Sequence, residues 1–160
     1  MKAGITGHQN LGADPIITWV RNTLADLIHD HKISQGFTCL AKGADQLFAQ
    51  ILTEKEIPFT AVIPCSDYDK AFEDQSAKSA YLGLVQKAGE IIRLNFARPS
   101  EEAFFAAGKK VVQCSDLVFA VWNGEPAAGL GGTGDIVKFS KQAGKPVVHL
   151  NPVTLKVTVL

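Results

Sequence analysis

The sequence predicts an α/β protein with a three-layer α/β/α, Rossmann-like architecture and a mostly parallel sheet. Short runs rich in β-branched and apolar residues alternate along the chain with longer amphipathic stretches. The short runs are almost continuously apolar, which is typical of strands covered on both faces. Regular alternation of strands and helices favours βαβ units with right-handed crossovers and parallel strands.

Six apolar runs are the predicted strands of this sheet. They cover residues 2–6, 37–41, 59–65, 90–94, 116–122 and 146–150. A seventh segment, residues 153–160, alternates apolar and polar residues, which predicts a strand at the edge of the sheet.

Five amphipathic stretches are the predicted helices. They cover residues 14–31, 44–55, 75–88, 100–113 and 133–143. In the first, Asp14 is the expected cap and Pro15 occupies the first helical position. The last closes on Gly144, a residue type that favours the end of a helix.

Length and composition set limits on the function. The chain has 160 residues, which we expect to form a single domain over residues 1–160. Sixteen Lys and Arg balance sixteen Asp and Glu, so the whole-chain charge does not favour duplex nucleic acid or an anionic membrane. Three widely spaced cysteines do not form a disulfide framework, and the first residues do not resemble a signal peptide. We therefore expect a cytoplasmic protein.

Open α/β sheets bind ligands beyond the carboxyl ends of their strands, so the loops that follow the strands are the candidate site. The first loop contains Thr6, Gly7, His8 and Gln9, directly after the first predicted strand. Glycine allows a ligand to approach the backbone, and the polar side chains can bond phosphate or ribose. The alternative is a polar turn with a glycine bend.

Two further loops offer possible ligand contacts. In the second loop, Gly43 permits a tight turn. Asp45 can bond a ribose hydroxyl, or it can simply cap the next helix. Lys42 can bind a phosphate, or it can be an ordinary surface charge. In the third, Tyr68 or Phe72 can stack on a base, or can fix the loop to the core.

The fourth loop gives the strongest signal, because four glycines within six residues lead directly into a predicted helix. Such a loop places backbone amides at a helix N-terminus, where an anion is favoured. Thr133 is the expected cap, and its hydroxyl can also bond a phosphate. No Lys-Ser or Lys-Thr pair follows, which argues against a P-loop. The predicted ligand contacts are Asn123, Gly124, Gly131, Gly132 and Thr133.

Taken together, these loops resemble those of the SLOG superfamily. The matching segments are GITGHQNLG, LAKGADQLFA, VIPCSDYDKAF and DLVFAVWNGEPAAGLGGTGDIV, and the likeness extends from Gly4 to about Pro152. The superfamily includes the Lonely Guy (LOG) phosphoribohydrolases and the DNA-processing protein A family. The resemblance implies a Rossmann-like domain that binds a nucleotide-derived ligand at the carboxyl edge of its sheet. It also implies that Gly131, Gly132 and Thr133 hold its phosphate.

The chain departs from the LOG pattern at the residues that perform catalysis there. LOG enzymes carry a PGGxGTxxE motif, whereas residues 131–137 lack both the intervening residue and the terminal Glu. Gln9 stands where relatives that read GHR have an arginine, which removes a bidentate phosphate donor. The remaining catalytic candidates are Asp135, Glu125 and Asp45.

The sequence thus predicts a sensor-type domain that binds a nucleotide or a nucleotide derivative. The alternative is a LOG-like hydrolase of the N-glycosidic bond of nucleoside monophosphates, and whether the chain is an enzyme stays open. A DNA-binding role ranks last because of the balanced charge. We expect no cofactor and no metal, since no cluster of ligating residues occurs. The expected partners are a small nucleotide-derived molecule and, in a homo-oligomer, further copies of the chain, with no duplex nucleic acid and no membrane.

Overall fold

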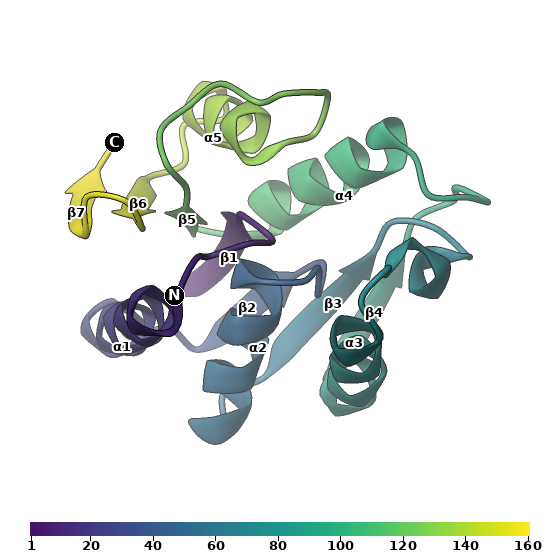
Figure 1. The fold of residues 1–160 in the computed structure, drawn as a ribbon, viewed down its shortest axis with the longest axis horizontal. Coiled ribbons are helices and arrows are strands. Elements are labelled where there is room, and N and C mark those ends of the chain that lie inside the picture. Colours follow the sequence, from purple (N-terminus) through teal and green to yellow (C-terminus); the bar gives the residue numbers. More distant parts are fainter.

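The computed structural model describes residues 1–160, which form one seven-stranded sheet with helices on both faces (Figure 1). The strands are β1 (Lys2–Gly7), β2 (Gln35–Thr38), β3 (Phe59–Ile63), β4 (Glu90–Arg93), β5 (Leu117–Val121), β6 (Val147–Asn151) and β7 (Lys156–Val159). The helices are α1 (Asp14–Asp30), α2 (Ala44–Glu54), α3 (Gln75–Lys87), α4 (Glu101–Cys114) and α5 (Thr133–Gln142), together with a short 3-10 helix, η1 (Tyr68–Ala71).

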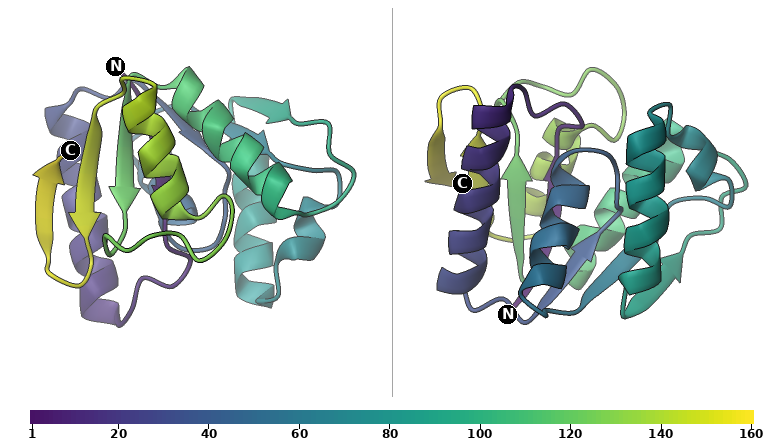
Figure 2. Two further views of the ribbon diagram at one scale, coloured as in Figure 1. Left: turned by 90° about the horizontal axis from the view of Figure 1, so that it is seen from above. Right: turned by 60° about the horizontal axis from the view of Figure 1, so that its bottom comes forward.

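The order of the strands places a reversal at the centre of the sheet. The order is β4-β3-β2-β1-β5-β6-β7, with all neighbours parallel except the antiparallel pair β6 and β7. Helices α1, α2 and α3 lie on one face and α4 and α5 on the other (Figures 1 and 2). The prediction of a three-layer, mostly parallel sheet with a C-terminal edge strand is confirmed. From β1 the chain adds strands toward one edge as far as β4, and from β5 it adds them toward the other edge. Such sheets open a crevice for ligands at this reversal of strand order, between β1 and β5.

Some boundaries differ from the prediction. β2 ends at Thr38 and not at residue 41, because Leu40 adopts a left-handed φ of 57° and its amide donates to the hydroxyl of Thr38 at 3.0 Å. The edge strand begins at Lys156, after a turn that the side chain of Asn151 holds by accepting two amides. Helix α1 begins at Asp14 itself, and no side chain caps it.

The two edge strands are less covered than the sequence predicted. Three of the four residues of β4 and all four of β7 are exposed. Helix α4 packs on β1, β2 and β3, and α5 packs on β1, β5 and β6, so this helix layer is centred on the middle of the sheet. None of the helices combines the length and the apolar composition that a membrane crossing requires.

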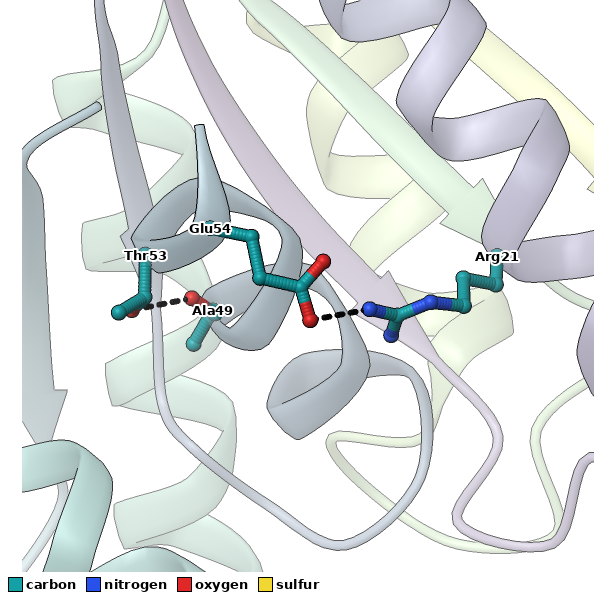
Figure 3. A network of polar contacts seen from close by, with 4 residues as sticks. All are labelled: Arg21, Ala49, Thr53 and Glu54. Atoms are coloured by element: carbon teal, nitrogen blue, oxygen red, sulfur yellow. Dashed lines mark hydrogen bonds and ion pairs between the residues drawn. The ribbon is translucent and has the colours of Figure 1, made fainter. Parts of the chain in front are cut away.

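Apolar packing between the helices and the sheet holds the fold together. The largest core cluster contains 27 buried residues, including Leu24, Phe48 and Phe119, which are fully buried between the sheet and the layer of α1 and α2. Each such side chain contributes roughly 1.5–3 kcal/mol by leaving water. Ion pairs add little, because Arg21 and Glu54, which join α1 to α2 in Figure 3, are solvent-accessible and a pair of this kind is worth about 0–1 kcal/mol.

Two glycines of the central strand allow this packing on both faces. A Cβ atom at Gly4 would lie 2.6 Å from Ser115 Oγ and 2.7 Å from Val111 Cγ1, at the end of α4. A Cβ at Gly7 would lie 2.5 Å from the Cβ of Ala44, the first residue of α2. Helices from both layers therefore approach the backbone of β1 directly.

We expect Gly43→Ala to lower the free energy of unfolding by about 1–3 kcal/mol. Gly43 has a φ of 89°, and an added Cβ would lie 2.4 Å from the carbonyl oxygen of His8. Urea unfolding followed by circular dichroism measures the change. The matched control is Gly83→Ala inside α3, where a Cβ meets nothing within 4 Å and should stabilise by about 0.5–1 kcal/mol. Equal effects of the two substitutions would contradict this account of Gly43.

Candidate functional site

A cavity of about 1000 Å³ lies at the carboxyl ends of the strands, beside the reversal between β1 and β5. It contains most of the residues that the sequence singled out. Its lining includes Thr6, Gly7, His8, Gln9, Lys42, Asp45, Asn123, Glu125, Gly131, Gly132 and Thr133. Gly43, Gly124 and Asp135 do not line it. The structure thus brings the four predicted loops together, while their contacts with a ligand stay a prediction.

Gly43 lies where the first two loops contact each other and does not line the cavity. Its missing side chain leaves room for the carbonyl oxygens of His8 and Gln9, which an added Cβ would meet at 2.4 and 2.5 Å. The next amide, of Ala44, donates to the carbonyl of His8 at 3.2 Å. The first turn of α2 therefore holds the loop that follows β1, and Gly43 supports the site without lining it.

The side chain of His8 connects the loops after β1 and β5. Its backbone amide donates to the carbonyl of Val121 at 3.0 Å, which continues the pairing of the two strands. Its ring atom Nε2 accepts a hydrogen bond from the amide of Asn123 at 3.1 Å. The first bond holds the backbone of His8 and the second holds its ring, at the point where the strand order reverses.

Strand β6 supports the end of β5 from the other side. Nε2–H of His149 donates to the carbonyl of Trp122 at 2.6 Å, and the side-chain NH₂ of Asn151 donates to the backbone carbonyl of Asn123 at 3.4 Å. The indole of Trp122 in turn donates to the carbonyl of Glu125 at 2.7 Å. His149 lies in the predicted strand 146–150, and the structure shows it half-buried and bonded to the loop that borders the cavity.

The glycine-rich loop folds back on itself before α5. A Cβ at Gly132 would lie 2.8 Å from the Cβ of Ala127, and one at Gly134 would lie 3.0 Å from the amide nitrogen of Ala127. The carboxylate of Asp135 accepts the amide of Gly131 at 3.1 Å. The glycines are thus required for the close packing of this loop, and Asp135 stabilises its shape.

Three consecutive amides at the start of α5 have no acceptor within the chain. They belong to Gly132, Thr133 and Gly134, and all three residues line the cavity. The helix begins at Thr133 after Gly132, so the hydroxyl of Thr133 does not cap it, unlike the prediction. Free amides at a helix N-terminus carry a partial positive charge and favour an anion.

Charged side chains around the cavity are mostly acidic. Lys42 is the one lysine or arginine in the lining, and its ammonium group pairs with Asp74 at 3.2 Å. This pairing lowers the pKa of Asp74. Glu73 and Glu125 also line the cavity. Positive charge for an anion therefore comes chiefly from backbone amides.

Asp45 is the one buried carboxylate of the site, with 7% of its surface exposed. One of its oxygens accepts the amides of Cys39 at 3.1 Å and Ala41 at 3.4 Å. Burial raises the pKa of Asp45 to about 7, although these backbone bonds act in the opposite direction. Burial and then the charge of Asp45 raise the pKa of the Cys39 thiol well above its ordinary value.

Aromatic residues form another wall of the cavity. Tyr68 is buried and packs edge-on against Phe72 and Tyr81, with ring centroids 5.2 Å apart in both pairs. It fixes η1 to the core. Phe72 stacks on Tyr81 and also lines the cavity, as does Phe104 of α4. Sequence analysis missed Phe104, because its spacing in α4 is that of an ordinary amphipathic helix.

No protein-family model and no curated protein matches the sequence. Solved structures do share the fold. DNA processing protein A (DprA) of Streptococcus pneumoniae aligns with a TM-score of 0.66 and 15% identity, over 92% of this chain and 49% of its own. The present chain thus spans about half the length of that protein.

Two further structures align with comparable quality. DprA of Helicobacter pylori, reported with a single-stranded DNA binding mode, has a TM-score of 0.67 and 18% identity over 96% of this chain and 70% of its own. The molybdenum cofactor binding protein of Rippkaea orientalis has a TM-score of 0.58 and 18% identity over 94% of this chain and 76% of its own.

The comparison with Helicobacter pylori DprA corrects the prediction of partners. That prediction excluded duplex nucleic acid and ranked a DNA-binding role last on the basis of balanced charge, yet a protein of the same fold binds single-stranded DNA. The prediction was therefore wrong, because whole-chain charge does not describe the charge at one surface. At the level of the fold, the resemblance is confirmed: the chain shares the Rossmann-like fold of the DprA and molybdenum cofactor binding proteins.

Proposed function

We propose that this chain is a ligand-binding domain whose cavity takes a nucleotide or a nucleotide derivative. The observation that carries the proposal is the run of free amides at Gly132, Thr133 and Gly134, three residues that line a cavity of about 1000 Å³ at the strand reversal. A phosphate accepts several such hydrogen bonds at once, and the dipole of α5 favours its charge. Exposed atoms of Phe72 and Phe104 offer apolar surface for a base.

The charges of the lining favour a ligand with a single phosphate. Glu73, Asp74 and Glu125 line the cavity, and Lys42 alone opposes them. A second or third phosphate would add negative charge among carboxylates with no further cation to offset it. A nucleoside monophosphate, or two nucleosides joined by one phosphodiester, meets this limit better than a triphosphate.

The structural neighbours support a ligand at this fold. Helicobacter pylori DprA binds single-stranded DNA, and the Rippkaea orientalis protein binds the molybdenum cofactor. Single-stranded DNA is a chain of nucleotides, so a nucleotide is the repeating unit of that ligand. The residues proposed to contact it here are those in the lining of the cavity: Thr6, Gly7, His8, Gln9, Lys42, Asn123, Gly132 and Thr133.

A thermal-shift screen tests the proposal directly. Nucleoside monophosphates, diphosphates and triphosphates, cyclic nucleotides and ADP-ribose are compared at equal concentration. A ligand at a hundred times its dissociation constant stabilises the folded chain by about 2.7 kcal/mol, which gives a clear rise in melting temperature. Monophosphates should give the largest shift. No shift with any nucleotide would contradict the proposal.

A second function is favoured by one observation, the raised pKa of Asp45. A carboxyl group with a pKa of about 7 is partly protonated at neutral pH and can donate a proton to a leaving group. Asp45 also lines the cavity. These features suit a hydrolase that cleaves the N-glycosidic bond of nucleoside monophosphates.

Thr133→Pro should weaken nucleotide binding by roughly tenfold or more, since a hydrogen bond to a charged group contributes about 1.5–3 kcal/mol. Proline lacks the amide but suits the first position of a helix, so α5 should remain intact. Isothermal titration measures the affinity. Thr133→Ala keeps the amide and removes the hydroxyl and the methyl group of the side chain, so its effect should be smaller. Equal losses in the two variants would contradict a role for the amide.

If the hydrolase function holds, Asp45→Asn should abolish release of free base while nucleotide affinity stays within about threefold. The asparagine keeps an oxygen for the amide of Cys39 but cannot supply a proton. Chromatography of the reaction mixture measures the base, and Asp26→Asn on the exposed face of α1 is the control. No release by the unmodified protein at high concentration rules this function out.

The stability of the protein should fall as the pH rises from about 4 to about 7. The raised pKa means that the folded chain binds the proton of Asp45 more tightly than the unfolded chain. The stabilisation is therefore full at low pH and is lost as Asp45 ionises, with an upper limit of about 4 kcal/mol. Urea unfolding should show the stability of Asp45→Asn rising relative to the unmodified protein across this range. If the stabilities of the two proteins changed with pH in parallel, the raised pKa of Asp45 would be contradicted.

A further inference from the structure

A second, smaller cavity of about 430 Å³ adjoins the first at the same edge of the sheet. It lies between the loop after β1, the start of α1 and the turn that joins β6 to β7. Figure 2 shows that turn beside the first residues of α1. Ile16 of α1 and Val153 of the turn both line it.

The two cavities share a border. His8 and Asn123 line both of them, and the amide of Asn123 donates to Nε2 of His8 at 3.1 Å. Because the cavities share these two residues, they are adjacent, and a ligand that spans His8 and Asn123 would reach both. The volume of the second cavity is within the range of ligand pockets, about 300–1,000 Å³, and leaves room for a ring system.

The lining of the second cavity differs in chemistry from that of the first. It contains no Asp, Glu, Lys or Arg. Leu11, Ile16 and Val153 supply aliphatic surface. The amide of Asn10 accepts the backbone N–H of Gly12 at 3.1 Å through its oxygen, which leaves its NH₂ group as a donor. Such a lining suits an uncharged heterocycle with hydrogen-bond acceptors.

We propose that the second cavity is a subsite for a second nucleoside, so that the full ligand is two nucleosides joined through one phosphate. This inference rests on the proposed function, because the first nucleotide must occupy the main cavity. The ligand carries only one negative charge, which limits repulsion from the carboxylates of the main cavity, and its second nucleoside brings no charge into the uncharged second cavity. The same unit is found in a free dinucleotide and in a single strand.

Filling the subsite tests the proposal. Val153→Trp places a large side chain at the wall of the second cavity, and because Val153 is 75% exposed the fold should be unaffected. Val159→Trp on β7 is the matched control, at a position that is 69% exposed and outside both cavities. Isothermal titration compares adenosine monophosphate with adenylyl-adenosine for each variant and for the unmodified protein.

Adenylyl-adenosine should bind the unmodified protein roughly tenfold more tightly than adenosine monophosphate. Val153→Trp should remove this advantage while the affinity for the monophosphate is kept, and Val159→Trp should change neither. A longer oligoadenylate then distinguishes the source of the ligand, because affinity continues to rise with length only if a strand is recognised.

Other outcomes overturn the proposal in different ways. If the monophosphate binds but adenylyl-adenosine binds no more tightly, the subsite is wrong and the proposed function stands. The same holds if Val153→Trp leaves the advantage of adenylyl-adenosine unchanged. If Val153→Trp weakens both ligands equally, the two cavities do not act as separate subsites. If neither ligand binds, the proposed function fails and the subsite fails with it.

Discussion

The pairing of β1 with β5 is the constraint on which the rest of the structure depends. Both strands are central and almost fully buried, and their junction sets the strand reversal beside the cavity. The pairing places helices on both faces of β1, and the missing side chains of Gly4 and Gly7 give those helices room. Larger residues at either position would push α4 or α2 away from the sheet, and α2 carries the loop that contacts His8.

The fold could be predicted from the sequence because each element has a local pattern, whereas much of the site depends on contacts between distant segments. Apolar runs and amphipathic spacing gave the strands and helices to within a few residues. Glycines marked the loops correctly, yet Gly43 supports the site from behind and Asp135 holds its own loop. Such roles depend on which atoms of another loop lie opposite, and Phe104 is recognised only once α4 borders the cavity.

The partner prediction failed because it used the charge of the whole chain alone. Equal numbers of acidic and basic residues describe the chain as a whole, but the cavity combines several carboxylates with one lysine. The free amides of Gly132, Thr133 and Gly134 add partial positive charge that no count of charged side chains includes.

The two imidazoles at the end of β5 have a consequence for spectroscopy. Nε2 of His8 accepts a backbone N–H and must be unprotonated, so the neutral ring carries its proton on Nδ1. Nε2 of His149 faces a carbonyl oxygen and must carry a proton. The neutral rings are thus opposite tautomers, which nitrogen chemical shifts distinguish. Histidine resonances can report separately on the two anchors of one loop, without any added label.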